Sequence, residues 1–402
     1  MKSHVSGDPQ ESGLAHIWAA MAELEAMVDS VPDLSDEDRA EGYAFVAGLY
    51  KWGIDRVFLA SDAGRPRFVR FTDTISQWGL GNPDNLYLVA EISEDGEYLV
   101  RGDRGSCATF VIEVRTGIGR REDNVHSRTL CFIEAEQLEL QPDGGFELSI
   151  GGVAGGAGNH LPLPPGATTI LVRATYADWP AETLGPLSIE ALGPPRPPVP
   201  RMSSKAMTTR LTRVGDVILA LGRFNDRTAR DWRGKVPVNA FPAPGTDVTL
   251  AAFPGQRSST AQFSLRDADE ALVVTMDQAP CRYLGFSIGH LHWYTNLDYH
   301  NRQCSLNSVQ ARLSSDGRYR YVICAKDPGV PNWIDTGGRL QGFMFFRCQG
   351  LLADSLPHPE TVITTTSRIR EILPADEPQI GLGERLEILR QRRLAVQRRH
   401  AY

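Results

Sequence analysis

The chain has 402 residues, 42% of them hydrophobic and 23% charged, which is the composition of a globular protein with room for two or three domains. Its formal net charge is −7, which argues against a general nucleic-acid binder, because such proteins usually carry a basic excess. The six cysteines form no CxxC pair, and neither a run of 18 apolar residues nor a secretory signal pattern occurs. We therefore expect a reduced, cytoplasmic protein that does not enter a membrane.

Two helical patterns open the chain. Apolar residues recur at intervals of three and four over residues 13–30, which is typical of an amphipathic helix. Ser35, followed by Asp38 at the third position, indicates a helix N-cap and a second helix that continues to about Tyr50. These patterns predict an N-terminal helical region over residues 1–80.

From about residue 85 the apolar residues alternate with a period of two. Five segments show this alternation and are separated by Gly, Asp and Pro turns: 86–92, 97–102, 108–114, 146–152 and 168–176. Short strands at this spacing favour a β-sandwich over a parallel sheet. We expect a first β-sandwich module over residues 81–190.

The segment ALGPPRPPVPR, residues 191–201, is the clearest domain boundary. Five prolines within seven residues favour polyproline II and prevent regular strand pairing. Beyond this linker the pattern predicts a helical connector over residues 202–246 and a second β-sandwich module over residues 247–355. A C-terminal extension over residues 356–402 follows.

The C-terminal extension ends in a basic helix. From Glu384 to Tyr402 the chain contains six arginines and two glutamates. Apolar residues form a stripe along this segment, including Leu386, Leu389 and Val396. The pattern predicts a helix that packs on its own or a sister subunit and keeps its arginines in solvent.

The two halves of the chain share one pattern. Asp143 and Asp316 are each followed by glycine, and each stands 16 positions before an asparagine, Asn159 and Asn332 respectively. In both copies an apolar strand closed by arginine comes next, ILVR in one and FMFFR in the other. This repeat predicts an internal duplication. The expected fold is mainly β with helical additions, built as tandem jelly-roll-like β-sandwiches.

These residues also carry a family resemblance. The segment LDYHNRQCSLNSVQARLSSDGRYRYVICAKDPGVPNWIDTGGRLQG resembles the C-terminal module of the bacterial family called domain of unknown function 1214. That module often follows one called domain of unknown function 1254. The segments NPDNLYLVAEISEDGEYLVRGDRG and GNHLPLPPGATTILVRATYADW are also similar to this family, so the likeness covers most of residues 40–350. It implies paired jelly-roll-like modules and no particular reaction. The sequence departs from the more usual Asn-Trp pair at His160.

The richest run of polar and aromatic side chains lies over residues 290–312. A cleft for a polyfunctional ligand needs such hydrogen-bonding groups, together with rings for apolar faces. The run is equally consistent with a long structural loop whose side chains cap backbone groups. The candidate ligand-binding residues in this run and the loop after it are His292, Trp293, Tyr294, Tyr299, Asn301, Arg312, Asn332 and Trp333.

Three aspartates are candidate catalytic residues, Asp298, Asp327 and Asp335. Two carboxylates can divide the roles of acid and base when their environments separate their pKa values. In the repeat, Asp327 aligns with Ala154 and Asp335 with Pro162, so these carboxylates belong to the second copy alone. Aspartate beside Gly or Pro is also a common turn former.

His290 and His292 form an H-x-H pair. On a strand both rings would project to one face and could reach one metal ion. No third histidine follows in the predicted later strands, so we expect no metal and no other cofactor. Cys304, with His300 nearby, is a weaker candidate for a nucleophile.

Together these features favour a small-molecule-binding protein or a cofactor-independent enzyme. An enzyme of this kind would catalyse hydrolysis, elimination or isomerisation of a partly apolar substrate in the second β module, without redox chemistry. The alternative is a non-catalytic assembly protein, a homo-oligomer built on tandem jelly rolls. The expected partners are a small ligand or a second copy of the chain, and neither nucleic acid nor a membrane.

Overall fold

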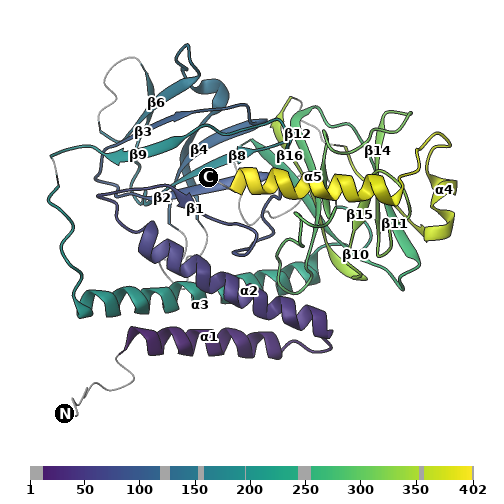
Figure 1. Cartoon of the computed structure of the whole chain (residues 1–402), viewed down its shortest axis with the longest axis horizontal. Coiled ribbons are helices and arrows are strands. Elements are labelled where there is room, and N and C mark those ends of the chain that lie inside the picture. Colours follow the sequence, from purple (N-terminus) through teal and green to yellow (C-terminus); the bar gives the residue numbers. More distant parts are fainter. Residues whose placement is uncertain are drawn as a thin grey trace.

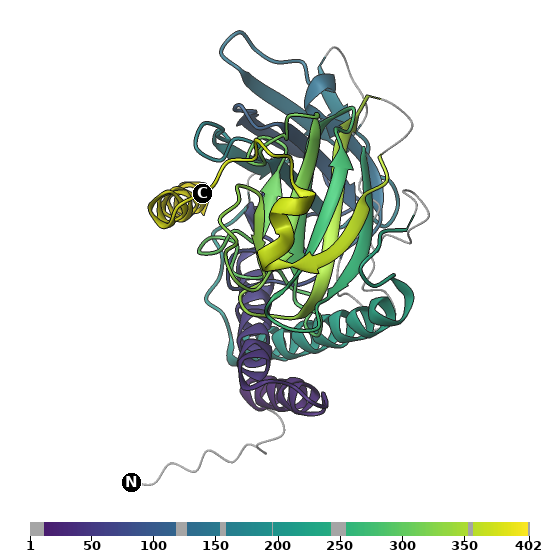
Figure 2. The same ribbon diagram turned by 90° about the vertical axis from the view of Figure 1, so that its right-hand side faces the viewer.

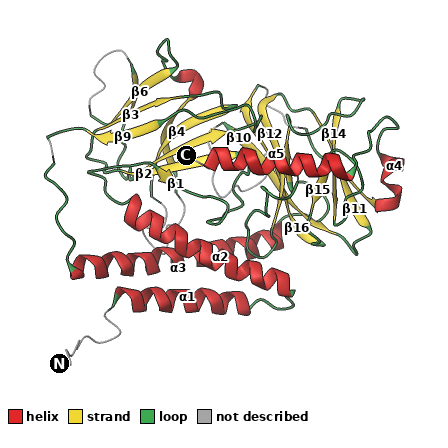
Figure 3. Ribbon diagram, viewed as in Figure 1, coloured by secondary structure: helices red, strands yellow, loops and turns green. Residues whose placement is uncertain are grey.

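The computed structural model of the chain describes residues 12–117, 127–152, 158–194, 196–242, 255–352 and 357–400. Over these residues the fold is mainly β, with four sheets and a few helices (Figure 1, Figure 3). The expected start of the second module at residue 247 and its expected end at residue 355 lie outside the described residues.

Three long helices lie together along one side of the sheets: α1 (Gly13–Asp29), α2 (Asp36–Ile54) and α3 (Ser204–Lys235). Each begins after a serine whose side chain accepts a hydrogen bond from a backbone amide of the first turn. The N-cap expected at Ser35 is confirmed, since its Oγ accepts from the Asp38 amide at 3.0 Å. The expected helical connector is α3.

The helices bury one face against the first sheet. Leu24 of α1 and Ile218 of α3 pack in one cluster with Val89 and Leu171 of that sheet. All four side chains are almost completely buried. Burying a side chain of this size contributes roughly 1.5–3 kcal/mol, so this cluster fixes the helices on the sheet. Helix α2 continues into a π-helical turn, η2 (Asp55–Leu59), which leads to the sheet.

The first β unit has two sheets. One has the order β1-β2-β8-β4-β5, with strands β1 (Val69–Arg70), β2 (Asn85–Glu91), β8 (Thr169–Thr175), β4 (Thr109–Arg115) and β5 (Thr129–Glu134). The other has the order β7-β6-β3-β9, with strands β7 (Asn159–Leu161), β6 (Gly145–Ile150), β3 (Tyr98–Asp103) and β9 (Leu187–Ala191). A 3-10 turn, η3 (Ala135–Gln137), follows β5. Strand β1 lies inside the region expected to be helical, so that expectation was too long at its C-terminal end.

The second β unit also has two sheets. One has the order β10-β16-β12-β13, with strands β10 (Gln256–Ser264), β16 (Gln341–Leu351), β12 (Cys281–Gly289) and β13 (Ser305–Asn307). The other has the order β15-β14-β11-β17, with strands β15 (Trp333–Asp335), β14 (Arg318–Cys324), β11 (Glu270–Asp277) and β17 (Glu360–Thr365). Strand β17 pairs with β11 along six residues, so the second unit extends beyond the expected boundary at residue 355.

The two β units have the same strand order. If β2 to β9 are matched in chain order with β10 to β17, both sheets of the first unit coincide with those of the second, apart from the additional β1. In each unit one strand pair is parallel, β6 with β7 and β14 with β15. An aromatic pair joins the two sheets of each unit, Phe110 with Phe146 in the first and Phe286 with Tyr321 in the second.

The C-terminal segment crosses both units. After β17 come a 3-10 turn, η4 (Thr366–Arg368), a short helix α4 (Ile369–Ile372), and then α5 (Leu382–His400). Figure 1 shows α5 running across both units, and Figure 2 shows it end-on beside the sheets. None of the described helices combines the length and the apolar character that a membrane span needs.

Three arginines of α5 are buried, at intervals of seven residues: Arg385, Arg392 and Arg399 are 3%, 5% and 7% exposed. A spacing of seven places them on one face of the helix. The expectation that the arginines of this helix are solvated is therefore wrong for these three. Their guanidinium groups stack on aromatic rings, such as Trp333 below Arg385 and Trp179 below Arg392.

The buried arginines join α5 to both β units. Arg385 forms an ion pair with Asp327 of the second unit at 2.9 Å. Arg399, at the other end of the helix, donates to the Pro83 carbonyl of the first unit at 2.6 Å. Helix α5 therefore connects the two units through contacts at its two ends.

Candidate functional site

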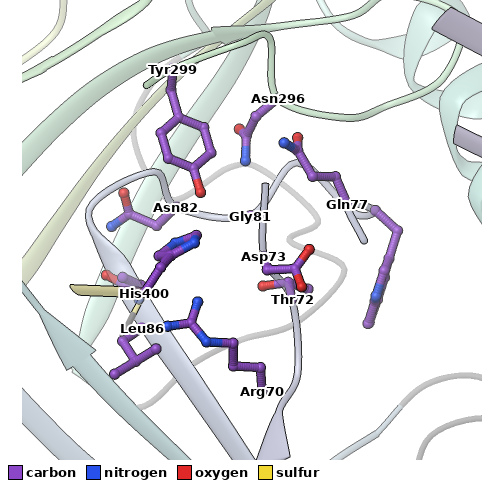
Figure 4. A pocket seen from close by; sticks show the side chains of 12 residues that line it. Arg70, Thr72, Asp73, Gln77, Gly81, Asn82, Leu86, Asn296, Tyr299 and His400 are labelled. Carbon is purple, nitrogen blue, oxygen red and sulfur yellow. The ribbon is translucent and has the colours of Figure 1, made fainter. Parts of the chain in front are cut away.

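A small polar cavity lies where the two β units meet the end of α5 (Figure 4). Its volume is about 20 Å³, which is room for about one water molecule. Arg70 of β1 lines it, with eight residues between Thr72 and Leu86, Asn296 and Tyr299 of the second unit, and His400 of α5. Three separate segments of the chain therefore build this cavity.

The loop from Thr72 to Asp84 is fixed on helix α2. Asp73 accepts hydrogen bonds from the backbone amides of Ile75 and Ser76 at 2.8 and 2.7 Å, and pairs with Lys51 of α2 at 2.8 Å. A side chain at Gly48 of α2 would collide with the Ile75 carbonyl oxygen, so glycine allows the close approach. Burial tends to raise the pKa of Asp73, but Lys51 and the two amides outweigh it and hold that pKa below its usual value.

Buried polar atoms without a partner gather around this cavity. Among the described residues, both amide atoms of Asn85, Nδ2 of Asn82, Oδ1 of Asn296, Oε1 of Gln77 and Nε1 of Trp78 have no hydrogen-bond partner. Asn82 and Asn85 are only 6% and 8% exposed. In folded proteins at least about 90% of buried polar groups are paired, so such a concentration requires an explanation.

The backbone beside the cavity is strained. Leu80 has φ 47° and Tyr294 has φ 48°, a region that bulky residues seldom occupy. The Leu80 amide donates to the Tyr294 carbonyl at 2.9 Å, so the two residues support each other across the two β units. They adjoin Gly81 and Asn296, which line the cavity. Strain of this kind costs about 1–3 kcal/mol per residue and is concentrated at functional sites.

The titratable groups of the cavity are held in single protonation states near neutral pH. Burial, together with the charges of Arg70 and Arg399, lowers the pKa of His400 to about 3, so its imidazole is neutral. Burial raises the pKa of Tyr299, whose hydroxyl therefore keeps its proton. Burial also lowers the pKa of Arg70, but a guanidinium stays charged in proteins.

A buried network holds Asn82 in place. The Tyr283 hydroxyl donates to Asn82 Oδ1 at 3.0 Å and also to Asp84, and Trp179 Nε1 donates to Asp84 at 2.7 Å. Burial raises the pKa of the Asp84 carboxyl. Since Oδ1 is used in this way, the Asn82 Nδ2 group is oriented and remains unpartnered beside the cavity.

Of the eleven residues that the sequence marked as catalytic or ligand-binding, Tyr299 lines this cavity. Asp327 pairs with Arg385, and Asp335 pairs with Arg302 at 3.0 Å. Asp298 accepts a hydrogen bond from the Asn301 side-chain amide at 2.9 Å, so the Asn301 side chain bonds within its own loop. Each of the three aspartates is therefore bonded to a residue other than the expected carboxylate partner.

The loop after β14 is structural in its contacts. Asn332 Oδ1 accepts from the Arg312 amide and Nδ2 donates to the Arg312 carbonyl, both at 2.7 Å. The contacts of Arg312 are thus made by its backbone, and its side chain is exposed. Trp333 donates from Nε1 to the Cys324 carbonyl at 3.0 Å, and its ring lies below Arg385. The polar atoms of the Asn332 and Trp333 side chains are therefore hydrogen-bonded within the fold.

The H-x-H pair lies in a turn after β12, and not on a strand as expected. His292 Nδ1 faces Arg233 Nη1 at 2.7 Å, and burial lowers the pKa of His292 to about 4. The Trp293 ring is stacked on His290, and its Nε1 donates to the Asp38 carbonyl at 2.8 Å. Tyr294 packs on Trp232. The two histidines therefore do not converge on one ion.

His290 instead joins Asp38 and Glu41 of α2, the one group in the described chain that is compact enough for a metal ion. Its Nδ1 accepts from the backbone amides of His292 and Trp293, so the proton lies on Nε2, which faces Asp38 at 2.9 Å. Metal binding through Nε2 would displace that proton. The hydrogen bond from His290 holds the pKa of Asp38 at about 2. Since Arg339 pairs with Glu41, this group is an ion-pair network.

Cys304 is buried in the second unit. Burial raises the pKa of its thiol to about 12, so the thiolate needed for nucleophilic attack does not form near neutral pH. The arrangement gives no support to a cysteine nucleophile at this position.

The sequence analysis missed the loop that lines the cavity. Its signal is the segment QWGLGNPDN, residues 77–85, which places Gln, Trp and two Asn side chains in the loop that leads into the buried strand β2 and at the first residue of that strand. Polar amides in a glycine-containing loop before a strand are ordinary turn chemistry. Their special character appears only when the burial of Asn82 and Asn85 is known.

No protein-family model and no curated protein matches the sequence. The fold is similar to the crystal structure of an uncharacterised protein from Burkholderia cenocepacia, with a TM-score of 0.79 and 27% identity over 88% of this chain and 97% of that one. A Vibrio parahaemolyticus protein is aligned over 80% of this chain and 98% of its own, with a TM-score of 0.41 and 12% identity. The first similarity shows that the mainly β architecture with its helices is a shared fold.

Proposed function

We propose that this protein binds a small polar ligand in the cavity between its two β units. The observation that carries the proposal is the concentration of unpartnered, buried amide groups around one small space. Each unpaired buried polar atom costs about 1–3 kcal/mol, and this cost is removed when a ligand supplies the missing hydrogen bonds. The site differs from the expected one, since the first unit and α5 contribute to it along with the second unit.

The cavity favours binding over acid–base catalysis. A general acid or base is most effective when its pKa lies near the working pH. Here the pKa of His400 is lowered to about 3, that of Tyr299 is raised, and that of Asp73 is lowered. None of these three shifts brings a pKa toward neutrality, and the Arg70 guanidinium stays charged, so we place binding before catalysis.

We also propose that the two β units are jelly-roll-like sandwiches that arose by duplication. The common strand order supports this origin, as do the corresponding parallel pairs β6–β7 and β14–β15. Membership of the domain of unknown function 1214 family remains a proposal, supported by the segments quoted above.

Native mass spectrometry of the full chain tests ligand binding. We expect the purified wild-type protein to carry a small molecule, and Asn85→Leu to lose it because both unpartnered amide atoms are removed. Asp335→Asn is the control, since Asp335 belongs to the site expected from sequence and lies outside the cavity. It should retain the same bound mass as the wild type.

A thermal-shift screen with small polar molecules covers the case in which the ligand is lost during purification. Ligands of the cavity should stabilise the wild type and Asp335→Asn, and leave Asn85→Leu unchanged. The proposal is overturned if no compound distinguishes Asn85→Leu from the wild type, or if Asp335→Asn loses the response.

A further inference from the structure

Positive charge accumulates beside the cavity on two buried arginines, Arg392 and Arg399, and on the half-buried Arg70. Arg70 lines it, and its Nη2 donates to the Arg399 carbonyl at 2.9 Å. Arg392 is buried and uses its hydrogen bonds on the Tyr299 carbonyl and the Ser305 hydroxyl. Arg399 is buried, and its Nε and Nη1 have no partner. None of these three arginines forms an ion pair with a carboxylate of the described chain.

The nearby carboxylates do not balance this charge. Asp73 and Asp55 share Lys51, which leaves one negative charge in this group, and Asp73 acts on Arg70. This one charge offsets only part of the positive charge of the three arginines. Asp84 is the other buried carboxylate that acts on Arg392 and Arg399, and burial disfavours its charged form. Uncompensated buried charge is strongly destabilising, so a net positive site without an anion is a costly arrangement.

We propose that the ligand of this cavity is an anion, and specifically a single carboxylate group held by Arg70. This inference rests on the proposed ligand-binding function and names the chemical class of the ligand. A carboxylate would accept hydrogen bonds from the Arg70 guanidinium and from the unpartnered donors Asn85 Nδ2 and Trp78 Nε1, and its negative charge would reduce the positive excess of the arginines.

Size and shape favour a carboxylate over a phosphate. The cavity has a volume of about 20 Å³, so it accepts a small group in place of about one water molecule. A carboxylate is planar and matches the planar fork of a guanidinium, whereas a phosphate is bulkier and tetrahedral. Figure 4 shows the side chains of Arg70, Asn82, Asn296 and Tyr299 around the same central space.

Acetate and acetamide form the decisive pair of probes, since they are nearly equal in shape and differ in charge. Isothermal titration of the full chain at pH 7, in chloride buffer of constant ionic strength, should detect acetate and not acetamide. Hexanoate distinguishes the source of the carboxylate: tighter binding than acetate indicates the head group of a longer molecule, and loss of binding indicates a small free carboxylate. Inorganic phosphate is the competing anion and should bind at least tenfold more weakly than acetate.

Variants of Arg70 test whether acetate binding depends on the positive charge of this residue. Arg70→Met should lower the affinity for acetate at least tenfold. Arg70→Lys keeps the positive charge and should retain part of the affinity for acetate. Acetate binding by Arg70→Lys would show that the loss in Arg70→Met is due to the missing charge and not to a folding defect. Arg67→Met removes an exposed charge three residues earlier and should bind acetate like the wild type. Equal binding of acetamide and acetate would overturn the proposal that the ligand is an anion, and would leave the proposed binding of a polar ligand in place. Failure of every probe, or normal acetate binding by Arg70→Met, would also overturn it.

Discussion

Asn332 and Asn159 make the same pair of hydrogen bonds at corresponding places in the two β units. Asn332 exchanges two bonds with the backbone of Arg312, and Asn159 exchanges two with the backbone of Glu139, at 2.7 and 3.0 Å. Each asparagine thereby ties the segment before a hairpin to the start of a short parallel strand. The shared role shows that Asn332, a ligand-binding candidate by sequence, serves the scaffold.

Replacing these asparagines should reduce stability without changing ligand binding. Asn332→Ala removes two bonds from a nearly fully buried position and should cost about 2–4 kcal/mol. Asn159→Ala, at a half-buried position, should cost about 1 kcal/mol, because water can replace its bonds. Urea unfolding followed by tryptophan fluorescence measures both. A loss of bound ligand in Asn332→Ala at wild-type stability would contradict the scaffold role.

Arg385 should anchor the start of α5. Arg385→Met removes bonds to Asp327, Gln303 and the Val330 carbonyl, and leaves the Asp327 carboxylate without its partner. Because Asp327 is partly exposed, we expect a loss of about 2–3 kcal/mol, below the usual cost of breaking a fully buried pair. Hydrogen exchange of the α5 amides should accelerate. Arg393→Met, on the exposed face of the same helix, should change stability by less than about 0.5 kcal/mol.

The sequence predicted those parts of the secondary structure that depend on local patterns. The period-two segments became β2, β3, β4, β6 and β8, and the cap at Ser35 starts α2. Strand β17 was missed, because its Val362 and Ile363 are half exposed and its pairing with β11 is a long-range contact. The seven-residue spacing of the buried arginines in α5 was visible, but their acceptors, such as the Pro83 carbonyl, were not.

The candidate site was predicted poorly for a physical reason. The sequence analysis placed the candidate site in the polar run over residues 290–312, where Asp298 bonds to the loop itself and His292 faces Arg233. The cavity takes Tyr299 from that run and combines it with Asn85 and His400, which are far away in sequence. Whether a polar side chain is satisfied depends on these distant partners, and a single sequence does not show them.

Stability should fall as the solution is acidified below about pH 6.5, in part through His400. The folded pKa of His400 is lowered to about 3 from a usual value of 6.5, so the unfolded chain takes up a proton that the folded chain does not. The groups that affect the pKa of His400 electrostatically are Arg70, Arg399, Asp73 and His300. The stabilisation by neutral His400 is complete above about pH 6.5 and is lost progressively toward pH 3.

Thermal unfolding midpoints at pH 7.5 and 5.0 measure this effect. His400→Gln should show a smaller decrease between the two pH values than the wild type, since glutamine does not titrate. His292 has the same sign of pKa shift and remains in both proteins, so it contributes equally to both decreases. An identical decrease in the variant and the wild type would show that His400 does not titrate differently on folding.

Two buried asparagines should respond in opposite ways to the same substitution. Asn85 has two unpartnered amide atoms, so Asn85→Leu should leave the ligand-free protein unchanged or stabilise it by about 1 kcal/mol. Asn307 is fully buried, and its amide bonds the Ala177 carbonyl and the Val309 and Gln310 amides. Asn307→Leu should therefore destabilise the protein by about 3 kcal/mol or more. Urea unfolding of ligand-free protein gives both values.

A binding group commonly reduces the stability of the empty site, so a stabilised Asn85→Leu that no longer binds ligand would distinguish a functional residue from a scaffold one. If Asn85→Leu is as destabilised as Asn307→Leu, Asn85 belongs to the scaffold and ordered water satisfies its amide.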